Sequence, residues 1–166
     1  MKLIPLDPEH GEALLQFEID NRAWFEQFVE PRDAAFYSPN GMAVHLTEYA
    51  SQRAAGSWLG FVIVDAQGAL AGRANLREIV DDTGEVGYRV GRGHIGQGYA
   101  SAAVAELQRI AIEERGLKHL HAFVTVANPA SARVVEKNGF VKTALLRAHA
   151  HVNGGAINAW RYQYDV

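Results

Sequence analysis

The sequence predicts a single α/β domain, residues 1–166, in which helices flank a mixed, mostly antiparallel sheet of about seven strands. Three observations lead to this prediction. Apolar runs of strand length alternate with helical patterns, without an internal repeat or a linker. A glycine-rich turn joins a strand to a helix in the middle of the chain. The composition, with 48% hydrophobic and 21% charged residues, is that of a globular domain.

The first third of the chain is predicted to hold one strand and three helices. Residues 2–6 form a short opening strand, and Asp7-Pro8 has the sequence of a helix start, with Asp7 as the cap. Asn21 is predicted to cap a second helix that carries aromatic residues on one side. We expect residues 31–41 to form turns and residues 42–55 to form a third helix.

The remainder is predicted to hold six strands and two helices. Residues 58–64, 70–80 and 85–90 form an antiparallel meander, because turn residues separate them. Two helices follow, with a strand between them, and a strand pair closes the chain. These later elements are a helix that ends at Gly116, a strand over 120–126, a helix that Asn128-Pro129 starts and Gly139 ends, and strands over 140–146 and 157–164.

The totals exclude several classes of function. There are no cysteines, so disulfides, thiolate nucleophiles and cysteine-based zinc sites are absent. The net charge is −3 and no cluster of basic residues is present, which argues against a nucleic-acid partner. The chain has no apolar run long enough to cross a membrane and no signal-peptide pattern at its start. We therefore expect a soluble cytoplasmic protein.

The most informative segment is the turn from Gly91 to Gly98, which holds four glycines in eight residues between a strand and a helix. Glycines let the backbone approach a ligand and present consecutive N–H groups. A helix N-terminus adds the positive end of its dipole, so an anion such as a pyrophosphate fits there. A turn of this composition without any ligand is the alternative interpretation.

The turn differs from two known phosphate-binding loops. It lacks the Gly-Lys-Ser/Thr ending of the P-loop. Residues 91–96 do match the dinucleotide pattern Gly-x-Gly-x-x-Gly. That pattern belongs in the first turn of a parallel βαβ unit, whereas this turn follows an antiparallel meander. A nucleotide-binding oxidoreductase is therefore a weak alternative.

The order of elements and the turn resemble the GCN5-related N-acetyltransferase (GNAT) superfamily. Its signature, Gln/Arg-x-x-Gly-x-Gly/Ala, corresponds to residues 95–100, with Ile95 in place of Gln or Arg. Gly84 to Val90, Asn128 to Ser131 and Glu136 to Phe140 resemble segments of the Rim-type branch, which includes ribosomal-protein N-terminal acetyltransferases. The resemblance covers about residues 59–164.

The resemblance implies a fourth strand that splays from the fifth, with the arm of acetyl-CoA in the gap. Backbone groups of Tyr88, Arg89 and Val90 would pair with that arm, and the amide of Val90 would polarise the thioester carbonyl. Asn128 would hydrogen-bond the arm, or serve only as a helix cap. The cofactor's pyrophosphate would bind the backbone of Ile95, Gly96, Gln97, Gly98, Tyr99, Ala100 and Ser101.

Two residues are the candidate catalytic groups. Ser131 matches a serine that the Rim-type branch places near the thiol, so it is the candidate acid toward the leaving thiolate and a further cofactor contact. Relatives often carry a tyrosine four residues later, where this chain has Val135. Glu85 is the candidate base, because a carboxylate at a sheet centre can take a proton from an ammonium through water. The alternatives are an exposed first-turn serine and a glutamate paired with Arg89 or Arg73.

The seven histidines suggest a metal site only weakly. His119/His121 and His149/His151 form two pairs on strand faces, without a third ligand. We therefore expect no metal, and His149 and His151 are candidates for the wall of the acceptor cleft. A histidine is the next choice of base after Glu85. The N-terminal helices are expected to form another wall, where Glu18, Asp20, Glu26 and Glu30 either attract a cationic amine or lie on solvated helix faces.

The leading hypothesis is an N-acetyltransferase that moves an acetyl group from acetyl-CoA to a primary amine in a ternary complex. The acceptor is a protein N-terminal α-amine, as the Rim-type resemblance implies, or a small-molecule amine. The alternative is a non-catalytic domain of the same fold that binds or senses acyl-CoA. The resemblance also implies a homodimer, because the C-terminal strands of relatives often pair across subunits.

Overall fold

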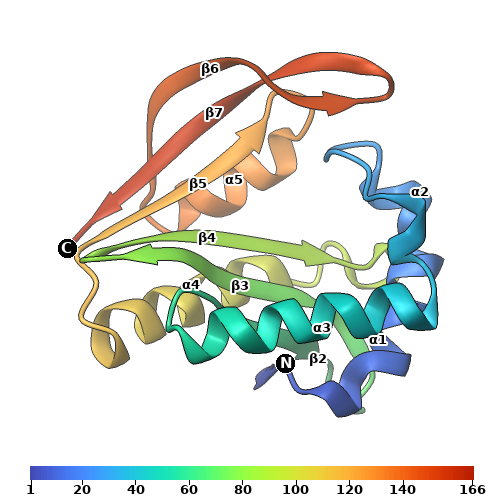
Figure 1. Cartoon of the computed structure of the whole chain (residues 1–166). Coiled ribbons are helices and arrows are strands. Elements are labelled where there is room, and N and C mark those ends of the chain that lie inside the picture. The colour runs from blue at the N-terminus through green and yellow to red at the C-terminus, as the bar shows by residue number, and fades with distance from the viewer.

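The computed structural model describes all 166 residues as one seven-stranded sheet with helices on both faces (Figure 1). The strand order is β1-β2-β3-β4-β5-β7-β6, and only the β4–β5 pair is parallel. This confirms the predicted fold class. The strands are β1 (Lys2–Pro5), β2 (Leu59–Val64), β3 (Leu70–Val80), β4 (Thr83–Val90), β5 (His119–Thr125), β6 (Val141–Val152) and β7 (Gly155–Asp165).

Five α-helices connect these strands. None of them is long and apolar enough to cross a lipid bilayer. They are α1 (Gly11–Asp20), α2 (Arg22–Phe25), α3 (Pro39–Ala54), α4 (Tyr99–Arg109), which continues as a π-helical turn (Ile110–Glu114), and α5 (Pro129–Lys137). Short 3₁₀ turns lie at Pro8–His10, Ala34–Phe36 and Arg92–His94.

Most of the predicted caps form. The Asp7 side chain accepts from the amide of Glu9, and the Asn128 side chain accepts from the amide of Ser131. The largest differences from the prediction concern three elements, and the other boundaries shift by one or two residues. The helix expected from residue 42 begins at Pro39, because Ser38 caps it and proline suits the first turn. Helix α2 has a single turn, and β6 extends six residues beyond its predicted end.

Alternation along the strands separates two layers of core. Val86, Tyr88 and Val90 of β4 face the layer that holds α4 and α5. On the other face, α1 and α3 cover β2 and β3 around Leu14, Leu46 and Val62. Glu85, Gly87 and Arg89 of β4 belong to this second face. The two faces of β4 therefore lead to different chemical surroundings.

Candidate active site

A gap opens between β4 and β5. Their parallel pairing covers only Thr83 to Glu85, where Glu85 lies opposite His121, and the strands then diverge (Figure 1). The amide of Gly91 donates to the carbonyl of Ala71 on β3. Because alternate residues direct their N–H and C=O groups to opposite neighbours, those of Tyr88 and Val90 point into the gap. The gap thus offers an unpaired strand edge to a ligand.

Arg89 does not share this arrangement. It lies opposite Arg73 in the β3–β4 register, so its backbone groups point toward β3. Its side chain leaves on the α1 face and pairs with Glu18. The structure therefore brings Tyr88 and Val90 to the gap, while Arg89 lies turned away from it.

Two hydroxyl groups meet between β4 and α5. The Oη of Tyr88 and the Oγ of Ser131 are 2.8 Å apart, within hydrogen-bond distance. Asn128 fixes the start of α5, because its Oδ1 accepts from the amide of Ser131 at 3.1 Å. Burial raises the pKa of Tyr88 to about 12, although the hydrogen bond with Ser131 opposes the shift. Tyr88 therefore stays protonated at neutral pH and can donate a hydrogen bond.

The contribution of the Tyr88 side chain was missed in the sequence. Only its backbone was singled out there, and the tyrosine position known from relatives is Val135, which is buried in the core. The alternation of β4 held the missing signal. It places Tyr88 on the helix-covered face and Glu85 on the opposite face, so Tyr88 is the hydroxyl that can reach Ser131.

The glycine-rich turn presents a row of free donors. The backbone N–H groups of residues 95–101 have no acceptor within the chain. Gly96 and Gly98 have φ angles of 74° and 81°, and a side chain at either would meet nothing within 4 Å. Consecutive free amides at the start of a helix with its positive dipole end suit a pyrophosphate. The turn can therefore hold an anion with backbone groups alone.

In contrast to the free backbone amides, several side chains of the turn contact other groups of the chain. Ser101 accepts from Asn138 at the end of α5, and Gln97 donates to the carbonyl of Gly93. Tyr99 stacks on His94, whose ring nitrogen lies 3.3 Å from a carboxylate oxygen of Asp65. These contacts hold the turn in place.

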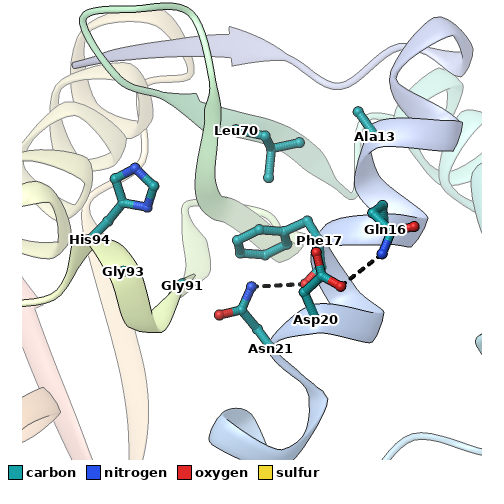
Figure 2. Close-up of a pocket in the computed structure, with 9 residues that line it drawn as sticks. All are labelled: Ala13, Gln16, Phe17, Asp20, Asn21, Leu70, Gly91, Gly93 and His94. Carbon is teal, nitrogen blue, oxygen red and sulfur yellow. Dashed lines mark hydrogen bonds between the residues drawn. The ribbon is translucent and has the colours of Figure 1, made fainter.

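A pocket of about 420 Å³ lies beside the turn, between it and α1 (Figure 2). The Asn21 side chain joins its two walls: it donates to the carbonyl of Phe17 and accepts from the amide of Arg92. A Cβ on Gly91 would come within 2.9 Å of the Phe17 ring, so this glycine permits close packing of the turn on α1. Asn21 thus positions the turn. The prediction that its side chain caps α2 is wrong, because that side chain makes no capping hydrogen bond.

Glu85 lies on the opposite face from Ser131, at the paired end of the gap. Its carboxylate accepts two hydrogen bonds from Arg77 of β3, and not from Arg89 or Arg73 as the sequence suggested. The hairpin register places Arg77 directly opposite it. His121 is its neighbour on β5, and burial lowers the pKa of that ring. The neutral imidazole is therefore a second group that can accept a proton beside Glu85.

The face of β4 beyond Glu85 has open space at Gly87. A side chain at Gly87 would meet nothing within 4 Å. Phe123 of β5 contacts both His121 and His149, with ring centroids 5.4 and 5.0 Å apart. His151 lies 3.5 Å from Glu30 of the segment after α2. His151 thus lies beside the N-terminal segment and His149 packs on β5, while no group of three potential metal ligands comes together.

Glu18 differs most from its predicted role. It is completely buried and ion-paired with Arg73, Arg89 and Arg32, so it is neither a free attractor for a cation nor part of a solvated face. Burial raises the pKa of Glu18, but the three guanidinium groups together hold it below its ordinary value. The carboxylate is therefore ionised inside the protein.

The sequence is similar to those of known acetyltransferases. Residues 1–141 match the family model described as "Acetyltransferase (GNAT) domain". The "Probable N-acetyltransferase YjcK" of Bacillus subtilis (strain 168) is 31% identical over 154 residues, which cover 90% of this chain and 85% of that protein.

Solved structures show the same fold. The ribosomal-protein-S5-alanine acetyltransferase from Vibrio fischeri superposes with a TM-score of 0.92 at 20% identity, covering 98% of this chain and 91% of that one. The spermidine N-acetyltransferase from Vibrio cholerae, in complex with CoA and spermine, gives a TM-score of 0.84 at 22% identity, covering 99% and 94%.

Proposed function

Because the chain belongs to the GNAT acetyltransferase family and is an N-acetyltransferase, we propose that it transfers the acetyl group of acetyl-CoA to a primary amine in a ternary complex. The acceptor we favour is a protein N-terminal α-amine, as in the Rim-type branch, with a small-molecule amine as the other candidate. The observation that carries the proposal is the row of seven free amides in the turn that follows the unpaired edge of β4.

Acetyl-CoA fits these groups as a substrate. The free amides of residues 95–101 bind its pyrophosphate, and the amide side chain of Asn128 has an unused N–H group for its arm. Tyr88 and Val90 pair with the arm as an added strand would, and the amide of Val90 polarises the thioester carbonyl. We propose that residues 1–166 act as one domain in this role.

The chemistry divides between the two faces of β4. On the Glu85 face, Glu85 or His121 takes the proton of the ammonium through water. The amine nitrogen then bonds to the carbonyl carbon, and the carbon–sulfur bond breaks. On the other face, the hydroxyl pair of Tyr88 and Ser131 receives the thiolate.

The pKa of Tyr88 defines what this pair can do. Transfer of a proton from a phenol with a pKa of about 12 to an ordinary thiolate, whose conjugate acid has a pKa of about 8.5, is uphill. The hydroxyl of Ser131 is a still weaker acid than a phenol, so we assign both members of the pair the stabilisation of the thiolate by hydrogen bonds, in place of the acid role predicted for Ser131. Two protons leave the nitrogen in all. The first, from the ammonium, passes through Glu85 or His121 to solvent, and the second, which stays on the nitrogen until it has bonded to the carbonyl carbon, ends on the departing sulfur.

The test is acetyl-CoA-dependent thiol release against a panel of peptides with varied N-termini, amino acids, polyamines and aminoglycosides. Glu85→Gln and Ser131→Ala are compared with the exposed controls Glu12→Gln and Ser51→Ala. The proposal expects release with at least one amine, slowed in the first two variants only. Equal release in all variants would refute the residue roles. Tight acetyl-CoA binding without release for any amine would favour the sensing domain instead.

We also propose that the chain forms a homodimer through its C-terminal strands. Strand β6 lies at the edge of the sheet and exposes Val141 and Leu145. Unpaired strand edges of this kind can pair with a second copy. Sedimentation of the chain, compared with a Val141→Lys variant, tests this assembly.

A further inference from the structure

Three arginines surround one buried carboxylate on the Glu85 face of the sheet. Glu18 of α1 lies 3.2 Å from Arg73 of β3, 3.0 Å from Arg89 of β4 and 3.8 Å from Arg32, which follows α2. We call these four residues the arginine cluster. Glu18 and Arg73 are fully enclosed, whereas the side chains of Arg89 and Arg32 are 22% and 28% exposed. The cluster therefore has a buried part, formed by Glu18 and Arg73, and a solvent-accessible part, formed by Arg89 and Arg32.

The cluster carries an excess of two positive charges. One carboxylate stands against three guanidinium groups. The ring of His45 touches Arg73, but burial, aided by Arg73, lowers its pKa to about 3, so it is neutral. The nearby Glu26 is occupied by Arg22. A structural ion pair at Glu18 would need one arginine, and each additional buried cation costs desolvation energy.

Two donors of the cluster are unpartnered. The Nε atoms of Arg32 and Arg73 are the only buried side-chain polar atoms in the chain without a hydrogen bond. Burial, and next the charge of Arg89, lower the pKa of Arg32 to about 10. It is still charged at neutral pH, yet the surroundings disfavour that charge. Buried polar groups are nearly always paired, so the cluster has hydrogen-bonding capacity that no group of the chain takes up.

The cluster borders the acceptor side of the gap. Arg89 leaves β4 on the same face as Gly87, which lies two residues or about 7 Å away along the strand and has open space around it. The segment that carries Arg32 crosses to β5, because the carbonyl of Phe28 accepts from Thr125 at 2.6 Å. In Figure 1, α2 lies beside the open end between β4 and β5. An anion bound here would belong to the acceptor, since the phosphate-binding turn presents its free amides elsewhere.

We propose that the amine acceptor carries a carboxylate, which Arg32 and Arg89 bind while Glu18 and Arg73 hold them in place. This inference rests on the proposed function and narrows its acceptor. Guanidinium groups bind carboxylates through paired, charge-assisted hydrogen bonds. A polyamine would instead meet like charges at this place. The carboxylate comes either from a free amino acid or from an acidic residue next to a peptide's N-terminus.

Matched acceptors test the proposal and separate these two sources. One pair is a peptide that begins Ala-Asp and its Ala-Asn twin, and the other is an amino acid and its amide. We expect kcat/KM to favour the acidic member of one pair by about tenfold to a hundredfold, the range of one charge-assisted hydrogen bond. Spermidine is expected to be a poorer acceptor than the acidic member of the preferred pair. Equal rates within both pairs, or a preference for spermidine, would overturn the proposal.

Variants identify the group responsible for the preference. Arg32→Gln should reduce the ratio of acidic to neutral acceptor by about tenfold, and Arg32→Lys should restore part of it. Arg109→Gln is the control, because Arg109 is an exposed residue of α4 on the other face of the sheet. A ratio that Arg32→Gln leaves at the wild-type value would contradict the assignment.

Isothermal titration calorimetry distinguishes a failure of the carboxylate site from a failure of the proposed function. The N-acetylated forms of the two peptides are titrated into the protein with CoA present. Tighter binding of the acidic form, lost in Arg32→Gln, supports the carboxylate site even without turnover of any amine, which would refute only the proposed function. Turnover of amines, together with equal binding of the two forms, would refute the carboxylate site alone.

Discussion

Replacement of Glu18 by glutamine tests whether the arginine cluster is held by a buried ion pair. The substitution keeps the shape of the side chain and removes the charge that faces three guanidinium groups. Arg73, which is 2% exposed, is then left as an uncompensated buried cation. Breaking a buried pair in this way costs about 3–5 kcal/mol. The unfolding entropy of 166 residues is about 0.35 kcal/mol/K, so Tm should fall by about 9–14 °C.

Differential scanning calorimetry measures this shift against Glu12→Gln, an exposed residue of the same helix. That control should change Tm by no more than about 1–2 °C, as surface substitutions do. Glu18→Gln combined with Arg73→Met should destabilise less than the two single changes added together, because Arg73→Met removes the buried cation that Glu18→Gln leaves uncompensated. A fall for Glu18→Gln no larger than that of the control would refute the ion-pair account.

The pH dependence of this difference has a defined sign. The pKa of Glu18 is lower in the folded protein than in the unfolded chain. Its contribution to stability is therefore complete above the unfolded value of about 4.3 and disappears as the pH falls through the folded value. The Tm gap between wild type and Glu18→Gln should narrow in acid. A constant gap down to acid unfolding would contradict this assignment.

Three further predictions concern the active site. Ser131→Ala and Tyr88→Phe should each lower kcat/KM by about tenfold or more, and the double change should cost less than the product because the hydroxyls act as a pair. Glu85→Gln should lower kcat by about a hundredfold. Burial lowers the pKa of His121, so any loss of activity that comes from protonation of the His121 ring should occur only below pH 6.5. Acetyl-CoA should slow hydrogen exchange of the amides of residues 95–101, and unchanged exchange there would contradict the phosphate site.

Most of the fold could be predicted because its signals are local. Cap residues, glycines with positive φ and two-residue turns mark the ends of elements, and apolar periodicity distinguishes strands from helices. The start of α3 was misplaced although Ser38-Pro39 carries the same signal as Asp7-Pro8. The full length of β6 was missed because exposed residues of an edge strand do not show the apolar pattern of a buried one.

The site was predictable only where its residues are neighbours in sequence. The turn at residues 95–101 is one continuous segment, so its composition indicated its role. The partner of Glu85 depended on strand register, which the turn at residues 81–82 sets and which places Arg77 opposite. The arginine cluster joins Glu18 to residues 55 and 71 positions away, and no local pattern reports such contacts.

The central claim is most directly tested by following an isotopically labelled acetyl group from acetyl-CoA to an amine by mass spectrometry. We predict label on the amine nitrogen of an acceptor with wild-type protein, at a rate greatly reduced in Ser131→Ala and unchanged in Ser51→Ala. Absence of acetyl-CoA binding, with no label on any amine, would contradict the account.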